Sequence, residues 1–231
     1  MKFRDILRSV LAGSALILTL TTLHAETLSF ADITWSDNKD TVLVKLKKQG
    51  ITVEIDKEPL GSYAVLHVLS GQSRDIPKIE EFYKQVVEPI DFKTEVKIRP
   101  THLKTGRSKP ENQIVKGFMA EIADVGPEVP LYYYVRLVPE KAESVLEVLE
   151  GKYGKFKDLP AILFAKVRKY AENGNEFLIY WYSEDAAGSH ADLYFFNLDN
   201  IRRYVPAKLE QLKAQKASSD DAAKKAAKDL F

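Results

Sequence analysis

The chain contains no cysteine, and this absence removes several classes of function at once. Without thiols there are no disulfides, no thiolate metal sites and no cysteine nucleophiles, and no cysteine can carry a lipid anchor after signal cleavage. The charges nearly cancel, with 34 lysine and arginine residues against 33 aspartate and glutamate residues. The strongly basic balance of a dedicated nucleic-acid-binding domain is therefore also missing. No phosphate-binding or catalytic motif stands out in the sequence.

Long apolar runs are rare, and the one at the N-terminus predicts export. Lys2, Arg4 and Arg8 give a basic start, and an apolar stretch follows over residues 10–20. This stretch is shorter than the roughly 20 residues that span a bilayer, so it fits a secretory signal peptide cleaved after Ala25. We expect a periplasmic protein, with release into the medium as the alternative.

The rest of the chain is expected to fold on packing alone. Removal of residues 1–25 takes away three basic residues and one acidic residue, which leaves a net charge of about −1. No later segment is apolar enough to span a membrane. We expect a single domain over residues 26–212, with two small subdomains meeting near 100–112 as the alternative. Residues 213–231 form a charged tail rich in alanine and lysine, either frayed helix or disorder.

Capping residues, prolines and apolar spacing predict helices over residues 37–49, 76–88 and 139–153, and a last helix from Asp199 that Pro206 kinks or restarts. Alternating or short apolar runs predict strands, and these cover residues 33–35, 51–55, 63–69, 92–98, 114–123, 131–138, 162–171, 176–183 and 193–197.

Groups of antiparallel strands separated by helices favour an α+β fold. The pair Asn173-Gly174 lies between two predicted strands and is the favoured sequence of a tight hairpin turn. A helix followed by antiparallel strands recurs after residues 36, 75 and 139. We therefore expect one or more antiparallel sheets with helices packed on one face, in repeated helix-then-strands units.

Two local strings resemble those of small exported bacterial proteins of unknown function. One is Ile33-Thr34-Trp35 ahead of the first predicted helix, and the other is Lys152-Tyr153-Gly154-Lys155 at a helix end. Such proteins often have glycine directly after the tryptophan and proline after the second string, where this chain has Ser36 and Phe156. The resemblance supports the fold and implies no active site.

A basic segment is the first candidate for binding. Over residues 93–109 the cationic side chains greatly outnumber the acidic ones, and the predicted binding residues are Lys97, Arg99, Lys104 and Arg107. A basic strand face that runs into a loop can bind an acidic protein, lipid head groups or glycan phosphates. The alternative is an edge strand whose lysines prevent aggregation, followed by an ordinary solvated loop.

Aromatic residues give a second candidate surface. Alternation places Tyr180 and Tyr182 on the opposite face of a strand from Trp181. Exposed tyrosines can stack on sugars or anchor a protein interface, whereas cross-strand aromatic pairs only stabilise a sheet. Both interpretations remain open from the sequence.

The polar loop over residues 184–192 is the candidate for chemistry. His190 and Asp192 are two residues apart, so on a strand they share a face, and Asp185 could complete a divalent-metal site. Ser189, His190 and a carboxylate could alternatively form a nucleophile set. The third interpretation is a solvated hairpin loop.

The remaining histidines give no second catalytic candidate. His67 lies in a predicted strand and is expected to be a core or interface residue, and His102 belongs to the basic segment.

Taken together, these features predict an exported binding protein. We expect a non-enzymatic interaction module without a cofactor, which recognises an envelope protein or an anionic envelope component. The alternatives are a metal-dependent or other hydrolase that uses Asp185, His190 and Asp192, and a carrier of a small ligand held against the aromatic strands.

Overall fold

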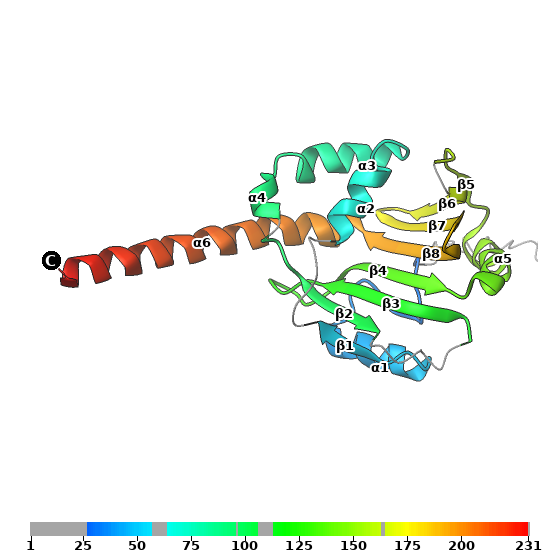
Figure 1. The fold of residues 1–231 in the computed structure, drawn as a ribbon, viewed down its shortest axis with the longest axis horizontal. Helices are drawn as coiled ribbons and strands as arrows, with labels where there is room; N and C mark the ends of the chain where they lie inside the picture. Colours follow the sequence, from blue (N-terminus) through cyan, green and yellow to red (C-terminus); the bar gives the residue numbers. More distant parts are fainter. Residues whose placement is uncertain (1–26, 57–63, 96, 106–112, 163–164, 231) are drawn as a thin grey trace, which may run out of the picture.

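The computed structural model describes residues 27–56, 64–95, 97–105, 113–162 and 165–230. The predicted signal peptide and Arg107 lie outside these residues. Within them the chain forms an antiparallel sheet of 8 strands, in the order β1-β2-β3-β4-β8-β7-β6-β5 (Figure 1). The strands are β1 (Val53–Asp56), β2 (Thr101–Thr105), β3 (Val115–Ile122), β4 (Pro130–Leu137), β5 (Lys157–Asp158), β6 (Ala165–Asn173), β7 (Glu176–Asp185) and β8 (Gly188–Asn197).

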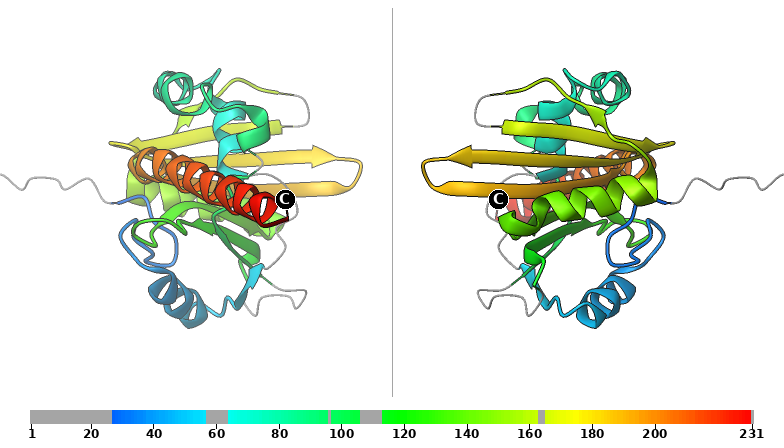
Figure 2. Two further views of the ribbon diagram at one scale, coloured as in Figure 1. Left: turned by 90° about the vertical axis from the view of Figure 1, so that its left-hand side faces the viewer. Right: turned by 90° about the vertical axis from the view of Figure 1, so that its right-hand side faces the viewer.

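Helices cover both faces of this sheet. Successive strand residues face opposite sides, and the neighbours Tyr132 and Tyr133 are both at most 1% exposed. Helices α1 (Lys39–Lys48) and α5 (Ala142–Tyr153) pack on one face. Helices α2 (Ala64–Gln72), α3 (Pro77–Phe82) and α6 (Leu198–Leu230) pack on the other. Figure 2 shows α6 in front of the sheet from one side and α5 in front of it from the opposite side.

The predicted α+β class is confirmed, but two finer expectations are not. Helices were expected on one face, and this is wrong because each face of the sheet has its own buried apolar cluster. The reason is visible in β7 and β8, where runs such as Phe177–Tyr180 are buried at every position instead of every second one. The helix-then-strands units do not recur as a structural repeat among the described elements.

Strong local signals predicted their elements correctly. Strands β3 and β4 pair around the turn at Gly126, whose φ is 75°, and β6 and β7 pair around Gly174, whose φ is 59°. After Pro139 a short 3-10 helix, η2 (Pro139–Lys141), leads into α5. The predicted second helix forms as α3, continued by the π-helical turn η1 (Tyr83–Val87).

Three predicted strands are wrong. Residues 33–35 lie where two successive turns meet, residues 64–72 form helix α2, and residues 92–95 form the short helix α4 (Phe92–Glu95). A short apolar run fits a buried helix as well as a strand, and in α2 it places His67 on the exposed side instead of in a core. The strand that follows in this region is β2, which begins at Thr101, after the predicted strand ends, and lies between β1 and β3 in the sheet.

The last helix, α6, extends well beyond the residues whose apolar spacing predicted it. The side chain of Asn197 accepts a hydrogen bond from Asn200 N–H at 2.9 Å, and α6 then continues through Pro206 to Leu230. The part after Leu212 projects from the body, and its side chains are exposed as far as residue 227 (Figure 1). Among the described helices, none combines the length and the apolar character needed to cross a membrane.

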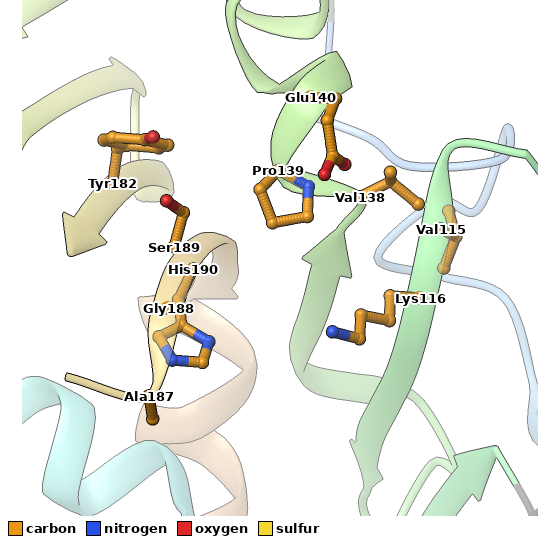
Figure 3. A pocket seen from close by; sticks show the side chains of 10 residues that line it. All are labelled: Val115, Lys116, Val138, Pro139, Glu140, Tyr182, Ala187, Gly188, Ser189 and His190. Carbon is orange, nitrogen blue, oxygen red and sulfur yellow. The ribbon is translucent and has the colours of Figure 1, made fainter. Parts of the chain in front are cut away.

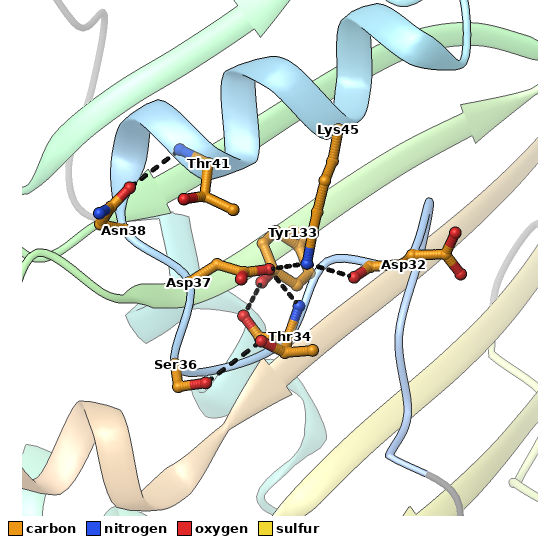
Figure 4. A network of polar contacts seen from close by, with 8 residues as sticks. All are labelled: Asp32, Thr34, Ser36, Asp37, Asn38, Thr41, Lys45 and Tyr133. Carbon is orange, nitrogen blue, oxygen red and sulfur yellow. Dashed lines mark hydrogen bonds and ion pairs between the residues drawn. The ribbon is translucent and has the colours of Figure 1, made fainter.

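A network of polar contacts holds residues 32–37, which precede α1, against that helix (Figure 4). Asn38 caps the helix by accepting from Thr41 N–H at 2.9 Å. Lys45 donates to Asp37 at 2.6 Å, and Thr34 N–H donates to the same carboxylate at 2.7 Å. Partial burial alone would raise the pKa of Asp37, but the hydrogen bonds from Lys45 and Thr34 prevail and lower it below the ordinary value of 3.8.

This network makes a testable contribution to acid stability. Because the folded-state pKa of Asp37 is lowered, its contribution is present above about pH 4 and is lost as the pH falls through the folded pKa. We expect Asp37→Asn to lower the free energy of unfolding by about 1 kcal/mol at pH 7. Urea unfolding at pH 7 and at pH 3 should show a smaller difference between the two proteins at pH 3, and a constant difference would contradict the assignment.

Candidate functional site

Two adjoining depressions mark the face of the sheet that carries α5. One has a volume of about 550 Å³ and lies at the end of β4, between the start of β3 and the β7–β8 hairpin. The other, of about 520 Å³, lies between α5 and strands β6 and β7. Both are lined by Pro139, Glu140 and Tyr182, so they form one groove, which we call the α5 groove. Three further depressions on the described surface measure about 230, 80 and 290 Å³.

Pro139 creates the space at the end of β4. The strand ends at Leu137, and Val138 N–H donates to Ile114 O at 2.8 Å. Pro139 has no N–H with which to continue the ladder, and its fixed φ suits the first position of η2. The chain therefore leaves the sheet here, while β8 extends further past the last β4 pair, Leu137–Ala191.

Two tyrosines line the groove from β7. Tyr180 is 3% exposed, and its burial, together with Tyr182 and Glu143, raises its pKa to about 12. Tyr182 is half-buried, and its hydroxyl donates to Glu184 at 3.0 Å. Glu184 also accepts from Lys166, and this bond lowers the pKa of Glu184. The predicted tyrosine pair therefore lies at one site, with the Tyr182 ring held by its hydroxyl.

Apolar and charged groups share the rest of the lining. Leu146 of α5 also lines the second depression, and so does Val167 of β6, which lies beside Tyr182 as its cross-strand partner. Lys169 is paired with Glu150 at 3.2 Å, whereas Glu140 and Glu143 are exposed and form no ion pair with any described residue. At the other end, the ammonium group of Lys116 points from β3 toward β8 (Figure 3). Each depression is thus lined by apolar side chains together with acidic and basic ones.

The residues of the proposed metal or nucleophile loop do not converge on one point. The predicted loop is a tight hairpin, in which Ala187 N–H donates to Asp185 at 2.7 Å and Gly188 has a φ of 120°. His190 Nε2 lies 3.8 Å from Asp185 Oδ1. Ser189 and His190 are successive strand residues, and Figure 3 shows the serine hydroxyl directed toward Tyr182 and the imidazole directed toward Ala187.

Asp192 lies on the same face of β8 as His190, as the alternation predicted, but its carboxylate belongs to a separate cluster. Its carboxylate accepts from Tyr134 at 2.7 Å and from Arg136 at 3.2 Å. Burial, and after it the contact with Asp192, raises the pKa of Tyr134 far above its ordinary value, so the tyrosine keeps its proton and donates it to this bond throughout the physiological range. Within the described ranges there is no group of three or more His, Asp or Glu side chains placed to hold a metal ion.

The basic segment is divided between different environments. Lys97 and Arg99 are exposed ahead of β2, while Lys104 lies in β2 and is paired with Asp56 at 2.6 Å. His102 does not join a basic surface, because it is 8% exposed and its Nε2 lies 3.2 Å from the fully buried Glu121. Arg107 lies outside the described residues. These side chains therefore do not form the single strand face that the alternation at residues 92–98 predicted.

Sequence reasoning identified the tyrosines but missed the opposite wall of the groove. Glu140 and Leu146 come from η2 and α5, and no local pattern indicated that they would face β7. The sequence feature that indicates this site is Pro139, which directly follows a predicted strand. Proline has no backbone N–H for the ladder, so the strand pairing is expected to end there and to leave the neighbouring strand unpaired.

Comparisons with known proteins add no assignment to this geometry: no family model, no curated protein and no solved structure matches the chain. The resemblance noted in the two sequence strings therefore stays a prediction.

Proposed function

We propose that the protein is a non-enzymatic binding module that holds its ligand in the α5 groove. Following the export expected from the N-terminal sequence, the ligand belongs to another envelope protein or to an envelope component. The observation that carries this proposal is the continuity of two depressions, of about 550 and 520 Å³, across the shared residue Tyr182. Each volume lies within the range of about 300–1,000 Å³ common for ligand sites.

The character of the lining also supports binding. Tyrosines give a large contact area at a low cost in side-chain entropy, and they are enriched at positions that dominate binding energy. Tyr180 and Tyr182 are held in place before any ligand arrives, one by burial and the other by its bond to Glu184. A prearranged surface of this kind binds with little loss of conformational freedom.

The placement of the polar residues favours binding over hydrolysis. A serine nucleophile needs its base within hydrogen-bonding distance, but Ser189 and His190 point to opposite sides of β8 (Figure 3). Asp192 is engaged by Tyr134 and Arg136 on the other face of the sheet. The basic segment is the weaker binding candidate, because Lys104 is already paired with Asp56.

Site-specific photo-crosslinking in intact cells tests this proposal. A photoreactive residue at position 140, on the rim shared by both depressions, is expected to give one dominant crosslinked product. The matched control is position 148 of the same helix region, because Val148 is 70% exposed and lines neither depression. A product from position 148 but none from position 140 would show that the ligand binds elsewhere.

The substitution Tyr182→Ala should remove this product or reduce its yield about tenfold, because truncating an aromatic anchor commonly costs more than 1 kcal/mol. Tyr170→Ala is the control, since Tyr170 is also half-buried on the sheet but packs in the cluster on the other face. The melting temperatures of both variants establish that each remains folded. Equal yields from the two variants would contradict a role for Tyr182 in binding.

A further inference from the structure

The groove contains a short edge of β8 that lacks a partner strand. Leu137 pairs with Ala191, so an extended β4 would place residue 139 opposite Ser189. Position 139 is proline, and the chain turns into η2 there. Ser189 nevertheless remains in β8 and lines the first depression. An unpaired edge thus lies within a recess, bordered by Pro139 and Glu140.

Two hydrogen bonds in the sheet fix the direction of the backbone groups along this edge. In an antiparallel sheet, the N–H and C=O of one residue point toward the same neighbouring strand, and successive residues alternate. Leu159 N–H donates to Arg168 O at 2.9 Å, so Arg168 directs its backbone groups toward β5 and away from β7. Arg168 is opposite Trp181, which therefore directs its own groups toward β8.

The β7–β8 register shows which way the backbone groups of the β8 residues in the groove point. Trp181 pairs with Asp192, and two residues further Ser183 pairs with His190, so His190 directs its backbone groups toward β7. Ser189, paired with Glu184, must direct its N–H and C=O to the other side. Phe118 N–H donates to the side-chain oxygen of Thr105 in β2 at 3.3 Å, so Phe118 directs its N–H toward β2. The same alternation, carried from β3 through β4 to β8, also directs the backbone groups of Ser189 away from β7.

We propose that the ligand is a peptide segment in extended conformation that adds to β8 at Ser189, in the place that β4 vacates. This inference rests on the proposed function and names the class of ligand. One ligand residue donates its N–H to Ser189 O and accepts from Ser189 N–H, as in strand addition to a sheet edge. A sugar or a lipid chain has no such alternating donor and acceptor pair, so the edge favours a polypeptide.

The groove also specifies the side chains of this peptide. The serine hydroxyl is directed toward Tyr182, so the second depression opens beside the paired residue (Figure 3). Tyr180, Leu146 and Val167 line it, which suits one large apolar side chain. The unpaired carboxylates of Glu140 and Glu143 at its mouth favour a lysine or arginine next to that apolar residue.

The probe is a phage-displayed library of random linear dodecapeptides, selected against the full chain from residue 26 onward. We expect selected peptides to share an apolar residue beside a basic one and to lose at least tenfold in affinity to the Tyr182→Ala protein. A synthetic copy of one such peptide should lose at least tenfold in affinity when a single backbone nitrogen, the one that pairs with Ser189 O, is methylated. Methylation at the two flanking nitrogens should have little effect.

Amide hydrogen exchange gives a readout on the unaltered protein. In the free chain the Ser189 amide should exchange quickly, and saturating peptide should slow it at least tenfold. The neighbouring His190 amide is the internal control, because its bond to β7 exists in both states. A peptide that needs Tyr182 but leaves Ser189 exchange unchanged would overturn strand addition.

The two proposals fail in different ways. If the crosslinker at position 140 captures a product but the library yields no peptide sensitive to Tyr182→Ala, the groove is a binding site and its ligand is not a peptide. If selected peptides bind equally well to the Tyr182→Ala protein, they bind outside the groove, and the inference is wrong. If position 140 gives no product at all, the proposed function itself fails.

Discussion

Replacement of Phe195 by alanine is expected to lower the free energy of unfolding by about 3–5 kcal/mol, the range for deleting a buried phenylalanine. Phe195 lies in β8 near the middle of the sheet and is 0% exposed. Its ring centroid is 6.4 Å from that of Tyr133 and 6.3 Å from that of Phe30. The cavity left by the ring would have its walls on two strands and on the N-terminal segment, which limits how far the site can collapse.

Urea unfolding followed by circular dichroism measures this loss. Val148→Ala provides the control, since Val148 is 70% exposed on α5 and its truncation should change stability by less than about 0.5 kcal/mol. A loss below about 1 kcal/mol for Phe195→Ala would mean that this face of the sheet is not packed as described.

The adjacent residue extends the same test to the second face. Phe196 is also 0% exposed, and its ring stacks on Phe177 at a centroid distance of 5.4 Å in the other apolar cluster. Phe196→Ala should therefore be about as destabilising as Phe195→Ala. In a sheet covered on one face only, one of these two substitutions would be tolerated. Two similar losses would support the two helical layers over the one-sided arrangement expected from the sequence.

Local signals account for the elements that could be predicted. Helix α1 follows from its capping residues and Gly50, and the β6–β7 hairpin follows from Asn173-Gly174, because turns and caps act over a few neighbouring residues. Helix α2 could not be predicted in this way. Its apolar run fits a strand or a helix, and packing against α3 and the sheet decides between them.

Local sequence patterns predict the candidate site even less completely than the fold. Alternation along β7 predicted that Tyr180 and Tyr182 share a face, and it is a property of the strand itself. The opposite wall at Leu146 depends on where α5 crosses the sheet, which no short-range pattern records. The alternation at residues 92–98 predicted a strand, and this prediction was wrong. Tertiary packing overrode the local propensity, and part of that segment forms helix α4.

The second large effect is expected at a buried ion pair that attaches the α2–α3 connection to β6. The Arg168 side chain is 1% exposed, and it donates to Asp75 at 2.7 Å, to Gln72 at 2.8 Å and to Pro160 O at 2.7 Å. Its guanidinium group also lies over the ring of Trp181, 5.1 Å from the centroid. A buried cation held by one carboxylate is strongly destabilised when that carboxylate is removed.

We expect Asp75→Ala to lower the free energy of unfolding by about 3 kcal/mol, because Arg168 would keep its charge in a buried place with only neutral acceptors. Arg168→Met combined with Asp75→Ala should recover most of this loss, since an apolar side chain then fills the space without a charge. Urea unfolding of the wild type, both single variants and the double variant gives the coupling energy between the two residues. Glu80→Gln is the control, because the Glu80–Lys84 pair is exposed and its loss should cost less than about 0.5 kcal/mol. A double variant that loses as much as the sum of the single variants would show that Asp75 stabilises the connection independently of Arg168.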